Sequence, residues 1–266
     1  MTRFAWASDL HLDHLDRPGH RALDALLHAI GAPAVVVTGD IANAPTLATA
    51  LMAMAAAARV PVHFVLGNHD HFGGSVGAVR DAITALGEQR PDIRWLPPAG
   101  VVRLDAKTVL VGVDGWADGR LGDPLATPLV LNDDRLIAEL AAQPLRAGKV
   151  AVKRALADAD AARLEVLIAR ALDTDAATIV IATHVPPFAE VLPRSGRLAS
   201  PQWLPILVCA ATGAVIRRAA QEYPSRRFEV FCGHTHVAAD VRLADNLRCR
   251  VMAARYGEPR VETVQL

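Results

Sequence analysis

Cysteine is scarce in this sequence, and the lack of paired cysteine motifs excludes several classes of protein. The 266 residues include only three cysteines, Cys209, Cys232 and Cys249, and no CxxC pair occurs. A disulfide framework and a cysteine-bound zinc site are therefore not expected. Buried, reduced thiols in a cytoplasmic protein are the simplest interpretation.

An excess of one charge and long apolar runs are lacking as well. Lys and Arg number 28 and Asp and Glu number 28, so the formal net charge is +0. This balance gives no reason to expect a nucleic-acid partner or an anionic membrane surface. The N-terminal residues do not resemble a signal peptide, and the Ala-rich stretch 46–58 is too short to span a bilayer, so we expect no membrane association. The oligomeric state stays open.

The sequence does contain enough apolar residues for a large core, arranged in an α/β pattern. Hydrophobic residues make up 52% of the chain, and we expect one domain over residues 1–266. Short runs rich in β-branched residues predict strands covered on both faces, at 4–7, 34–38, 62–66, 109–113, 178–183 and 228–232. Ala- and Leu-rich stretches between them predict helices at 19–30, 45–58, 75–87, 152–172 and 207–222.

Two regions depart from this alternation. The tail predicts three successive strands, at 237–243, 249–255 and 260–264, which we expect to form an antiparallel meander that closes a sheet. The stretch 117–150 contains clusters of Gly, Pro and Asp before a short helical pattern at 134–142. We interpret this stretch as an insertion or a cap over one face of the domain.

Residue types that bind metals follow five of the six predicted strands, at the point where each strand ends. In an open α/β sheet, ligands bind beyond the carboxyl ends of the strands, so these side chains can converge. They are, in chain order, Asp9 and His11, Asp40, Asn68 with His69 and Asp70, His184, and His234 with His236. Imidazole favours Zn, Fe or Mn over Mg or Ca, and a carboxylate can bridge two ions. A pair of such ions would attract a phosphate group and activate water.

These motifs, taken in order, resemble those of the calcineurin-like metallophosphoesterases. That family carries D-x-H, G-D, G-N-H-D or G-N-H-E, a lone H, and G-H-x-H. This sequence has all five in the same order, spread over residues 9–236. The resemblance implies an α/β fold, α+β by some schemes, built as a four-layer αββα sandwich with two central mixed β-sheets. It also implies a hydrolase of phosphate esters that uses two metal ions.

The resemblance further implies a role for each residue of the motifs. Asp9, His11 and His236 would bind the first metal ion. Asn68, His184 and His234 would bind the second, and Asp40 would bridge both. The two ions would be Mn, Fe or Zn, and a hydroxide bridging them would attack phosphorus. His69 would be the catalytic residue that contacts the phosphate and protonates the leaving oxygen. Asn68 would contact the substrate as well.

The sequence departs from the Ser/Thr protein phosphatases of this family just after Asp40. Those enzymes have an Asp that orients the catalytic His and an Arg that binds phosphate, where this chain has Asn43 and Ala44. Ala cannot replace the bidentate recognition of phosphate by Arg. We therefore expect a small phosphomonoester or phosphodiester as substrate, with a nucleotide-type diester favoured. A broad-specificity phosphoprotein phosphatase, a nuclease and a non-catalytic scaffold of the same fold are the alternatives.

Smaller roles are expected for residues close to the motifs. His71 is a candidate to line the substrate pocket, whereas Asp70 is expected to hydrogen-bond the backbone of its loop. Asp114 is interpreted as a turn residue before Gly115. The segment 188–203 is either a lid that selects the leaving group or a plain surface loop.

Overall fold

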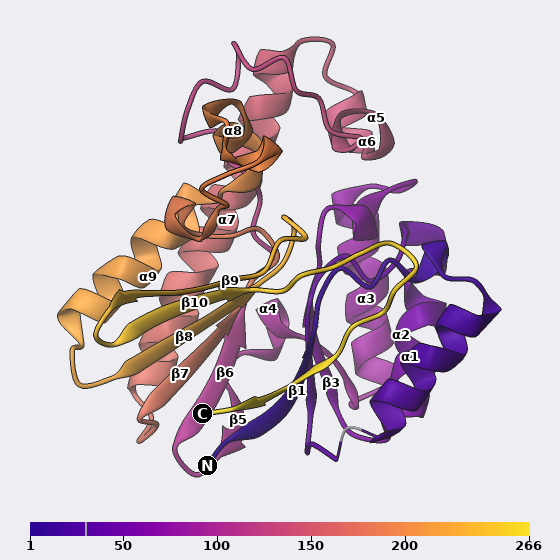
Figure 1. Ribbon diagram of the computed structural model, residues 1–266, viewed down its shortest axis with the longest axis vertical. Coiled ribbons are helices and arrows are strands. Elements are labelled where there is room, and N and C mark those ends of the chain that lie inside the picture. The colour runs from indigo at the N-terminus through magenta and orange to yellow at the C-terminus, as the bar shows by residue number, and fades with distance from the viewer. Residues whose placement is uncertain (30) are drawn as a thin grey trace.

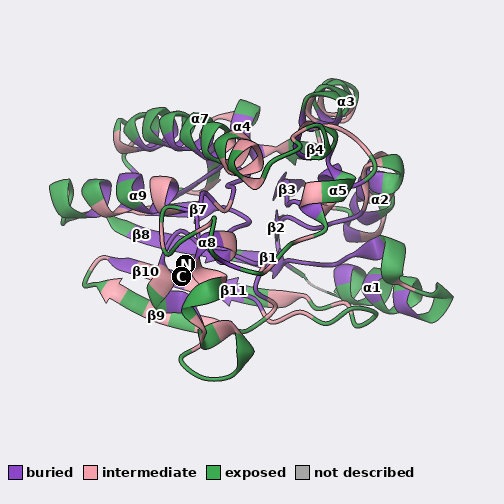
Figure 2. Ribbon diagram, turned by 90° about the horizontal axis from the view of Figure 1, so that it is seen from above, coloured by how far each residue is buried: buried purple, intermediate pink, exposed green. Residues whose placement is uncertain are grey.

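A computed structural model describes residues 1–29 and 31–266 of the chain. Two β-sheets lie face to face, and helices cover the outer face of each sheet (Figures 1 and 2). The arrangement is a four-layer αββα sandwich with two mixed sheets. The fold class predicted from the sequence is therefore confirmed.

The first sheet has the strand order β11-β1-β2-β3-β4, with β11 antiparallel to β1 and the other pairs parallel. Its outer face packs against three helices. The strands are β1 (Arg3–Ala7), β2 (Val35–Thr38), β3 (Val62–Val65), β4 (Ile93–Trp95) and β11 (Glu262–Gln265), and the helices are α1 (Arg17–Ala29), α2 (Ala44–Ala58) and α3 (Val76–Gln89).

The second sheet has the strand order β5-β6-β7-β8-β10-β9, in which β6, β7, β8 and β10 run parallel. The edge strands β5 and β9 are antiparallel to their neighbours. Helices α7 and α9 cover its outer face. The strands are β5 (Val102–Asp105), β6 (Thr108–Gly112), β7 (Thr178–Ala182), β8 (Arg227–Cys232), β9 (Ala239–Ala244) and β10 (Leu247–Val251), and the helices are α7 (Arg146–Leu172) and α9 (Ala210–Glu222).

The strands are apolar without alternation because both of their faces are covered. In β1, Phe4 and Trp6 point into the core between the sheets, whereas Ala5 and Ala7 point toward the helices. The ring of Phe231 from β8 lies edge-on to both, 5.4 Å from Phe4 and 4.8 Å from Trp6 between ring centroids. These contacts join the two sheets and bring the carboxyl ends of their parallel strands to one end of the sandwich.

Three short elements were not predicted. They are β4, β5 and the Pro-containing helix α4 (Leu96–Ala99), all too short to show a period. The predicted helices are present, with α7 starting at Arg146 rather than at 152. The end of the first predicted helix, at position 30, lies outside the described residues.

The tail corrects one prediction. β9 and β10 form the expected antiparallel pair, but β11 does not continue the meander. It leaves the second sheet and pairs with β1 of the first, where Val264 is buried between the sheets. The chain crosses from one sheet to the other above the strand ends (Figure 1). A single buried side chain in a four-residue strand left no pattern by which this switch could be predicted.

Residues 117–150 and 192–207 form an upper lobe above the carboxyl ends of the strands (Figure 1). The helices of the lobe are short: α5 (Asp133–Leu136), α6 (Ala138–Ala141), α8 (Leu204–Leu207) and the 3-10 turns Arg197–Ala199 and Pro201–Trp203, together with the first turn of α7. Within the described chain, no single helix has the length and apolar composition needed to cross a membrane; one strongly bent pair, Pro201–Leu207 with Ala210–Glu222, passes only when both are counted together.

Candidate dinuclear metal centre

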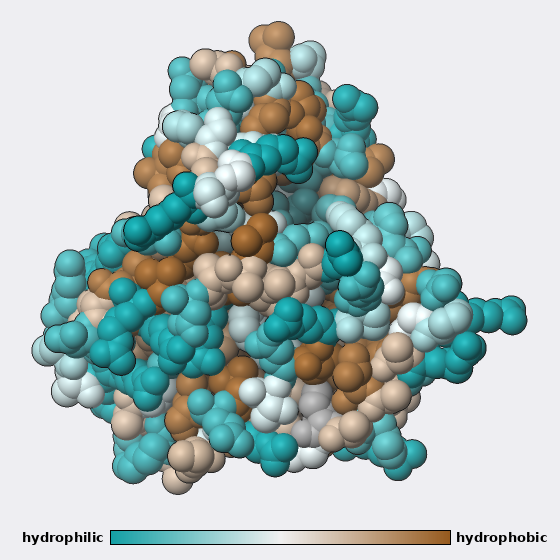
Figure 3. Space-filling model, in the orientation of Figure 1, coloured by the Kyte–Doolittle hydropathy of each residue, from teal (hydrophilic) through white to brown (hydrophobic). Residues whose placement is uncertain are grey.

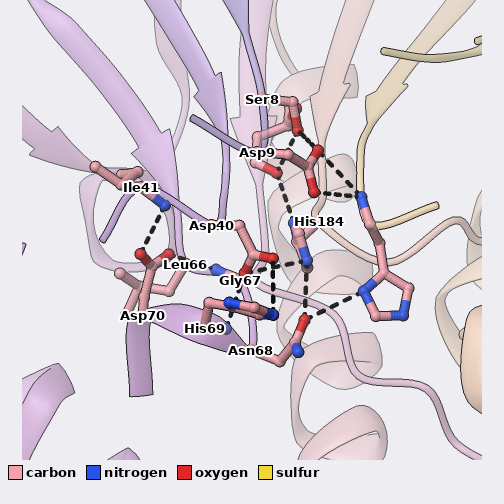
Figure 4. Close-up of polar contacts among 12 residues, drawn as sticks. Ser8, Asp9, Asp40, Ile41, Leu66, Gly67, Asn68, His69, Asp70 and His184 are labelled. Atoms are coloured by element: carbon pink, nitrogen blue, oxygen red, sulfur yellow. Dashed lines mark hydrogen bonds and ion pairs between the residues drawn. The ribbon is translucent and has the colours of Figure 1, made fainter. Parts of the chain in front are cut away.

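All seven predicted metal ligands lie in loops that follow parallel strands, at one end of the sandwich. The loops after β1, β2 and β3 come from the first sheet, and those after β7 and β8 come from the second (Figure 4). The structure brings the seven side chains together. They are Asp9, His11, Asp40, Asn68, His184, His234 and His236.

The backbone of these loops is strained at the ligands themselves. Only six non-glycine residues in the described chain have a positive φ, and five of them are Asp9, His11, Asp40, His234 and His236, with φ between 42° and 69°. This left-handed region is costly for a residue with a side chain. Such strain clusters at functional sites, where it fixes the direction of a side chain.

Two motif glycines permit these loops to approach one another. A Cβ on Gly67 would collide with the carboxylate and the backbone nitrogen of Asp40. A Cβ on Gly233 would collide with the side chains of Ser8 and Asp9. The glycine of the G-N-H-D motif is therefore required by close approach of two loops of the first sheet, and that of the G-H-x-H motif by close approach between the two sheets.

The first half of the site is formed by Asp9, His11, Asp40 and His236. Each offers one ligand atom, and these atoms all lie within 4.8 Å of one another. His236 Nε2 is 3.3 Å from Asp9 Oδ1, and His11 Nε2 is 3.7 Å from Asp40 Oδ2. Three ligands and a shared carboxylate at this spacing suit one transition-metal ion.

The second half of the site consists of acceptors that face one another. His184 Nδ1 donates to the carbonyl oxygen of Thr38 at 2.9 Å, so Nε2 keeps its lone pair. His234 Nε2 donates to the carbonyl oxygen of Ile206 at 3.0 Å, so Nδ1 keeps its lone pair. Both free nitrogens lie 3.1 Å from Oδ1 of Asn68. Three acceptors without a proton between them fit a bound cation.

Asp40 lies between the two halves and presents a different oxygen to each. Its Oδ2 faces His11, and its Oδ1 is 3.4 Å from His184 Nε2. This is the geometry of a carboxylate that can bridge two ions.

The charges of the site also favour cations. Burial, then the nearby charges of Asp9 and Asp70, raise the pKa of Asp40 well above its usual range. Burial lowers the pKa of His11 to about 2 and that of His234 to about 4, and it also lowers the pKa of His184. Neutral imidazole is the form that binds metal, and a bound cation would offset the two buried carboxylates. The residues present therefore fit two metal ions.

His69 lies beside the predicted metal ligands, and its backbone nitrogen donates a hydrogen bond to Asp40 Oδ1 at 2.8 Å. Its Nε2 is 3.9 Å from Asp40 Oδ2, and its ring stacks on Phe72 at 4.2 Å between centroids. Burial lowers the pKa of His69 to about 4, although the charge of Asp133 opposes this shift. The ring reaches the cavity next to the site, where a substrate phosphate would lie.

A cavity of about 340 Å³ opens directly above the ligands. Figure 3 shows the surface hollowed between the upper lobe and the body of the molecule. We call its lower side the floor, formed by Asp40, Asn68, His69, Phe72, His234, Thr235 and His236. We call its upper side the roof, formed by Leu131, Asn132, Asp133, Arg197, Leu198, Trp203 and Leu207.

Several residues of this cavity were not predicted from the sequence. Tyr256 lines it from the crossing tail, with its ring 4.4 Å from that of His11 and 5.3 Å from that of His236 between centroids. Its only sequence signal was a turn before Gly257. Asp133 lines it from the upper lobe and accepts a hydrogen bond from Asn68. Arg197 and Trp203 line it from the segment expected to be a lid or a surface loop.

The structure places His71 away from the cavity. The side chain is fully buried, packs against Trp116 at 5.3 Å between ring centroids, and does not line the cavity. This placement argues against the substrate contact expected for His71, because the residue turns inward from the short helix that it ends.

The two neighbouring acids hold loops in place. Asp70 accepts hydrogen bonds from the backbone nitrogens of Ile41, Ala42 and Gly67, as predicted. Asp114 does more than the turn role expected for it. It is buried and accepts from the Leu66 nitrogen, the Trp95 indole and Arg80, and thereby ties the two sheets together behind the site.

Comparisons with known proteins agree with this geometry. The family model of the calcineurin-like phosphoesterases matches residues 2–238. No curated protein sequence matches the chain. A phosphopantetheinyl hydrolase from Mycobacterium tuberculosis has a similar structure, with a TM-score of 0.68 and 16% identity over 96% of this chain and 89% of the other. A dimetal phosphatase from Danio rerio has a TM-score of 0.61 and 12% identity over 98% and 91%. The protein TT1561 from Thermus thermophilus has a TM-score of 0.57 and 12% identity over 99% and 98%. At these identities the structures show a shared fold.

Proposed function

The chain belongs to the calcineurin-like phosphoesterase family of metal-dependent hydrolases, and from that premise we propose that it cleaves small phosphodiesters, with nucleotide-type diesters favoured over monoesters. The observation that carries this proposal is the cavity beside His69, which is large and has aromatic walls. Phe72, Trp203 and Tyr256 all line it.

The aromatic walls suit a substrate with a planar group. A nucleobase stacks on aromatic rings, and such stacking is worth about 1–3 kcal/mol per base in single-stranded nucleic acids. At about 340 Å³, the cavity has room for a second ester group beside the phosphate. Ala44, at the position where the protein phosphatases carry Arg, packs near Gly74 and does not line the cavity. A diester carries less charge than a monoester and depends less on that missing guanidinium.

The residues of the floor divide the work of the reaction. When bound, the two ions would neutralise charge on the phosphate and activate the attacking water. Asp40 and Asn68 would help to hold these ions, and His69 lines the same cavity, where the phosphate would lie. The negative charge of a bound phosphoester favours the protonated ring of His69, which then donates its proton to the leaving oxygen.

A substrate panel tests the proposal. The protein is reconstituted with Mn, Fe or Zn, and kcat/KM is measured for bis-p-nitrophenyl phosphate, p-nitrophenyl phosphate, cyclic nucleotides and phosphopeptides. A phosphopantetheinyl ester is added because a protein of similar fold bears that name. We expect the diesters to give the highest kcat/KM. Faster turnover of phosphopeptides would favour the phosphoprotein phosphatase, and no turnover with any metal would favour the scaffold.

The proposed location is the cytoplasm, where thiols stay reduced. Cys209, Cys232 and Cys249 are buried free thiols, which is consistent with that compartment. The proposed partner is the small phosphoester alone.

A further inference from the structure

Asn68 binds through an amide, and an amide can turn in two ways. With Oδ1 toward His184 and His234, it offers a lone pair to the ion of the second half-site. With Nδ2 in that place, it would donate hydrogen bonds to the two free imidazole nitrogens, which lie 3.1 Å away. The turned amide would satisfy those nitrogens without a metal and would close the half-site.

One side chain selects between the two orientations. Asp133 of the insertion is only 5% exposed, and its Oδ1 accepts a hydrogen bond from Asn68 Nδ2 at 2.8 Å. A carboxylate offers only acceptors, so it pairs with the NH₂ group of the amide and not with its oxygen. The opposite end of the amide must then point at the imidazoles.

The insertion is fastened to the loop that carries Asn68, so Asp133 cannot drift from its partner. The backbone nitrogen of Gly73 donates to the carbonyl oxygen of Leu136 at 2.9 Å, and the backbone nitrogen of Ala138 donates to the carbonyl oxygen of Gly74 at 3.0 Å. Glu139 accepts from the first backbone nitrogens of α3, Val76 at 3.0 Å and Gly77 at 3.2 Å.

We propose that Asp133 is a positioning residue that holds Asn68 in its metal-binding orientation, and that the insertion thereby controls the affinity of the second half-site for its ion. This inference rests on the dinuclear site of the proposed function. It concerns only the metal affinity of the half-site of Asn68, His184 and His234. The metal affinity of the half-site of Asp9, His11 and His236 should not depend on the insertion.

The test is a titration of the metal-free protein with Mn²⁺, in which free Mn²⁺ is followed by electron paramagnetic resonance. Asp133→Asn keeps the size of the side chain but accepts either orientation of the Asn68 amide. We expect the second Mn²⁺ to bind about 10–100-fold more weakly, the usual effect of losing a partner behind a metal ligand. The first Mn²⁺ should bind as in the wild type.

The matched control is Asp134→Asn, which makes the same change one residue along. Lys153 is an ion-pair partner of both Asp133 and Asp134, and its Nζ lies 2.9 Å from Asp134 Oδ1. Among the described residues, Asp134 has no hydrogen bond to Asn68. We expect both Mn²⁺ affinities to stay at wild-type values.

Four results would overturn the inference. They are an unchanged second affinity in Asp133→Asn, an equal loss in Asp134→Asn, loss of the first ion together with the second, and a wild-type protein that binds only one Mn²⁺. The titration uses no substrate, so its outcome is separate from that of the substrate panel. The protein could bind two Mn²⁺ ions, the second more weakly in Asp133→Asn, and still hydrolyse none of the substrates. That result would support this inference and contradict the proposed function.

Discussion

The floor and the roof of the cavity are held in place in different ways. The floor consists of loops that follow parallel strands, in which left-handed residues and hydrogen bonds to backbone nitrogens hold the chain in place. The roof consists of loops and of helices of three or four residues, which side-chain contacts help to join, such as Thr127 Oγ1 donating to the Gln202 carbonyl at 2.8 Å. A floor held by backbone contacts suits chemistry that many substrates share, and a roof built from loops of the upper lobe suits the selection of one of them.

The largest effect is expected from removing the carboxylate shared by both halves of the floor. Asp40→Ala should reduce bound metal to less than one ion per chain and hydrolysis to background, since both ions lose a ligand. Metal analysis after Mn supplementation and turnover of bis-p-nitrophenyl phosphate measure this. Asp92→Ala is the control, because Asp92 is partly exposed, pairs with its neighbour Arg90 and does not line the cavity. Two ions retained in Asp40→Ala would contradict the bridging role.

A smaller loss is expected from His69, which serves the reaction without holding metal. His69→Gln should lower kcat about 10²–10⁴-fold, the usual contribution of a general acid, with metal content unchanged. His28→Gln is the control, because His28 is exposed on α1 and does not line the cavity. Loss of metal in His69→Gln would show that the ring supports the ligands instead of the leaving group.

Disturbing the close packing of the loops that form the floor should lower the stability of the protein. Gly233→Ala places a Cβ against Ser8 and Asp9, and we expect the free energy of unfolding to fall by about 1–3 kcal/mol, as for other overpacked sites. Urea denaturation of the metal-free protein measures this change. Gly77→Ala is the control: it lies in α3 with no atom within 4 Å of the added Cβ, and should be neutral or slightly stabilising. Equal stability of both variants would mean that the loops around Gly233 shift to accommodate the added Cβ at little cost in free energy.

The same contrast explains what could be predicted from the sequence. Each floor residue follows an apolar strand by one to four positions, or ends the turn just beyond it, so the strand pattern alone places it at the end of a sheet. Roof residues have no such reference. Asp133 stands just before a short helical pattern, and Trp203 lies between two prolines. Tyr256, which belongs to neither side, reaches the cavity because the tail crosses to the first sheet before β11. Their positions depend on tertiary contacts that leave no period in the sequence.

The smallest effect is expected from the roof, and it should depend on the substrate. Trp203 lines the cavity and holds Arg197 over its ring, with the guanidinium carbon 4.8 Å from the centroid. Trp203→Ala should lower kcat/KM for nucleoside or aryl diesters about 2–10-fold, the value of one aromatic contact. A dialkyl phosphate should show no change, and metal content should stay constant. Tyr223→Ala removes an exposed ring outside the cavity and serves as the control. Equal losses on aryl and alkyl substrates would mean that Trp203 supports the floor, and the division between a chemical floor and a selective roof would fail.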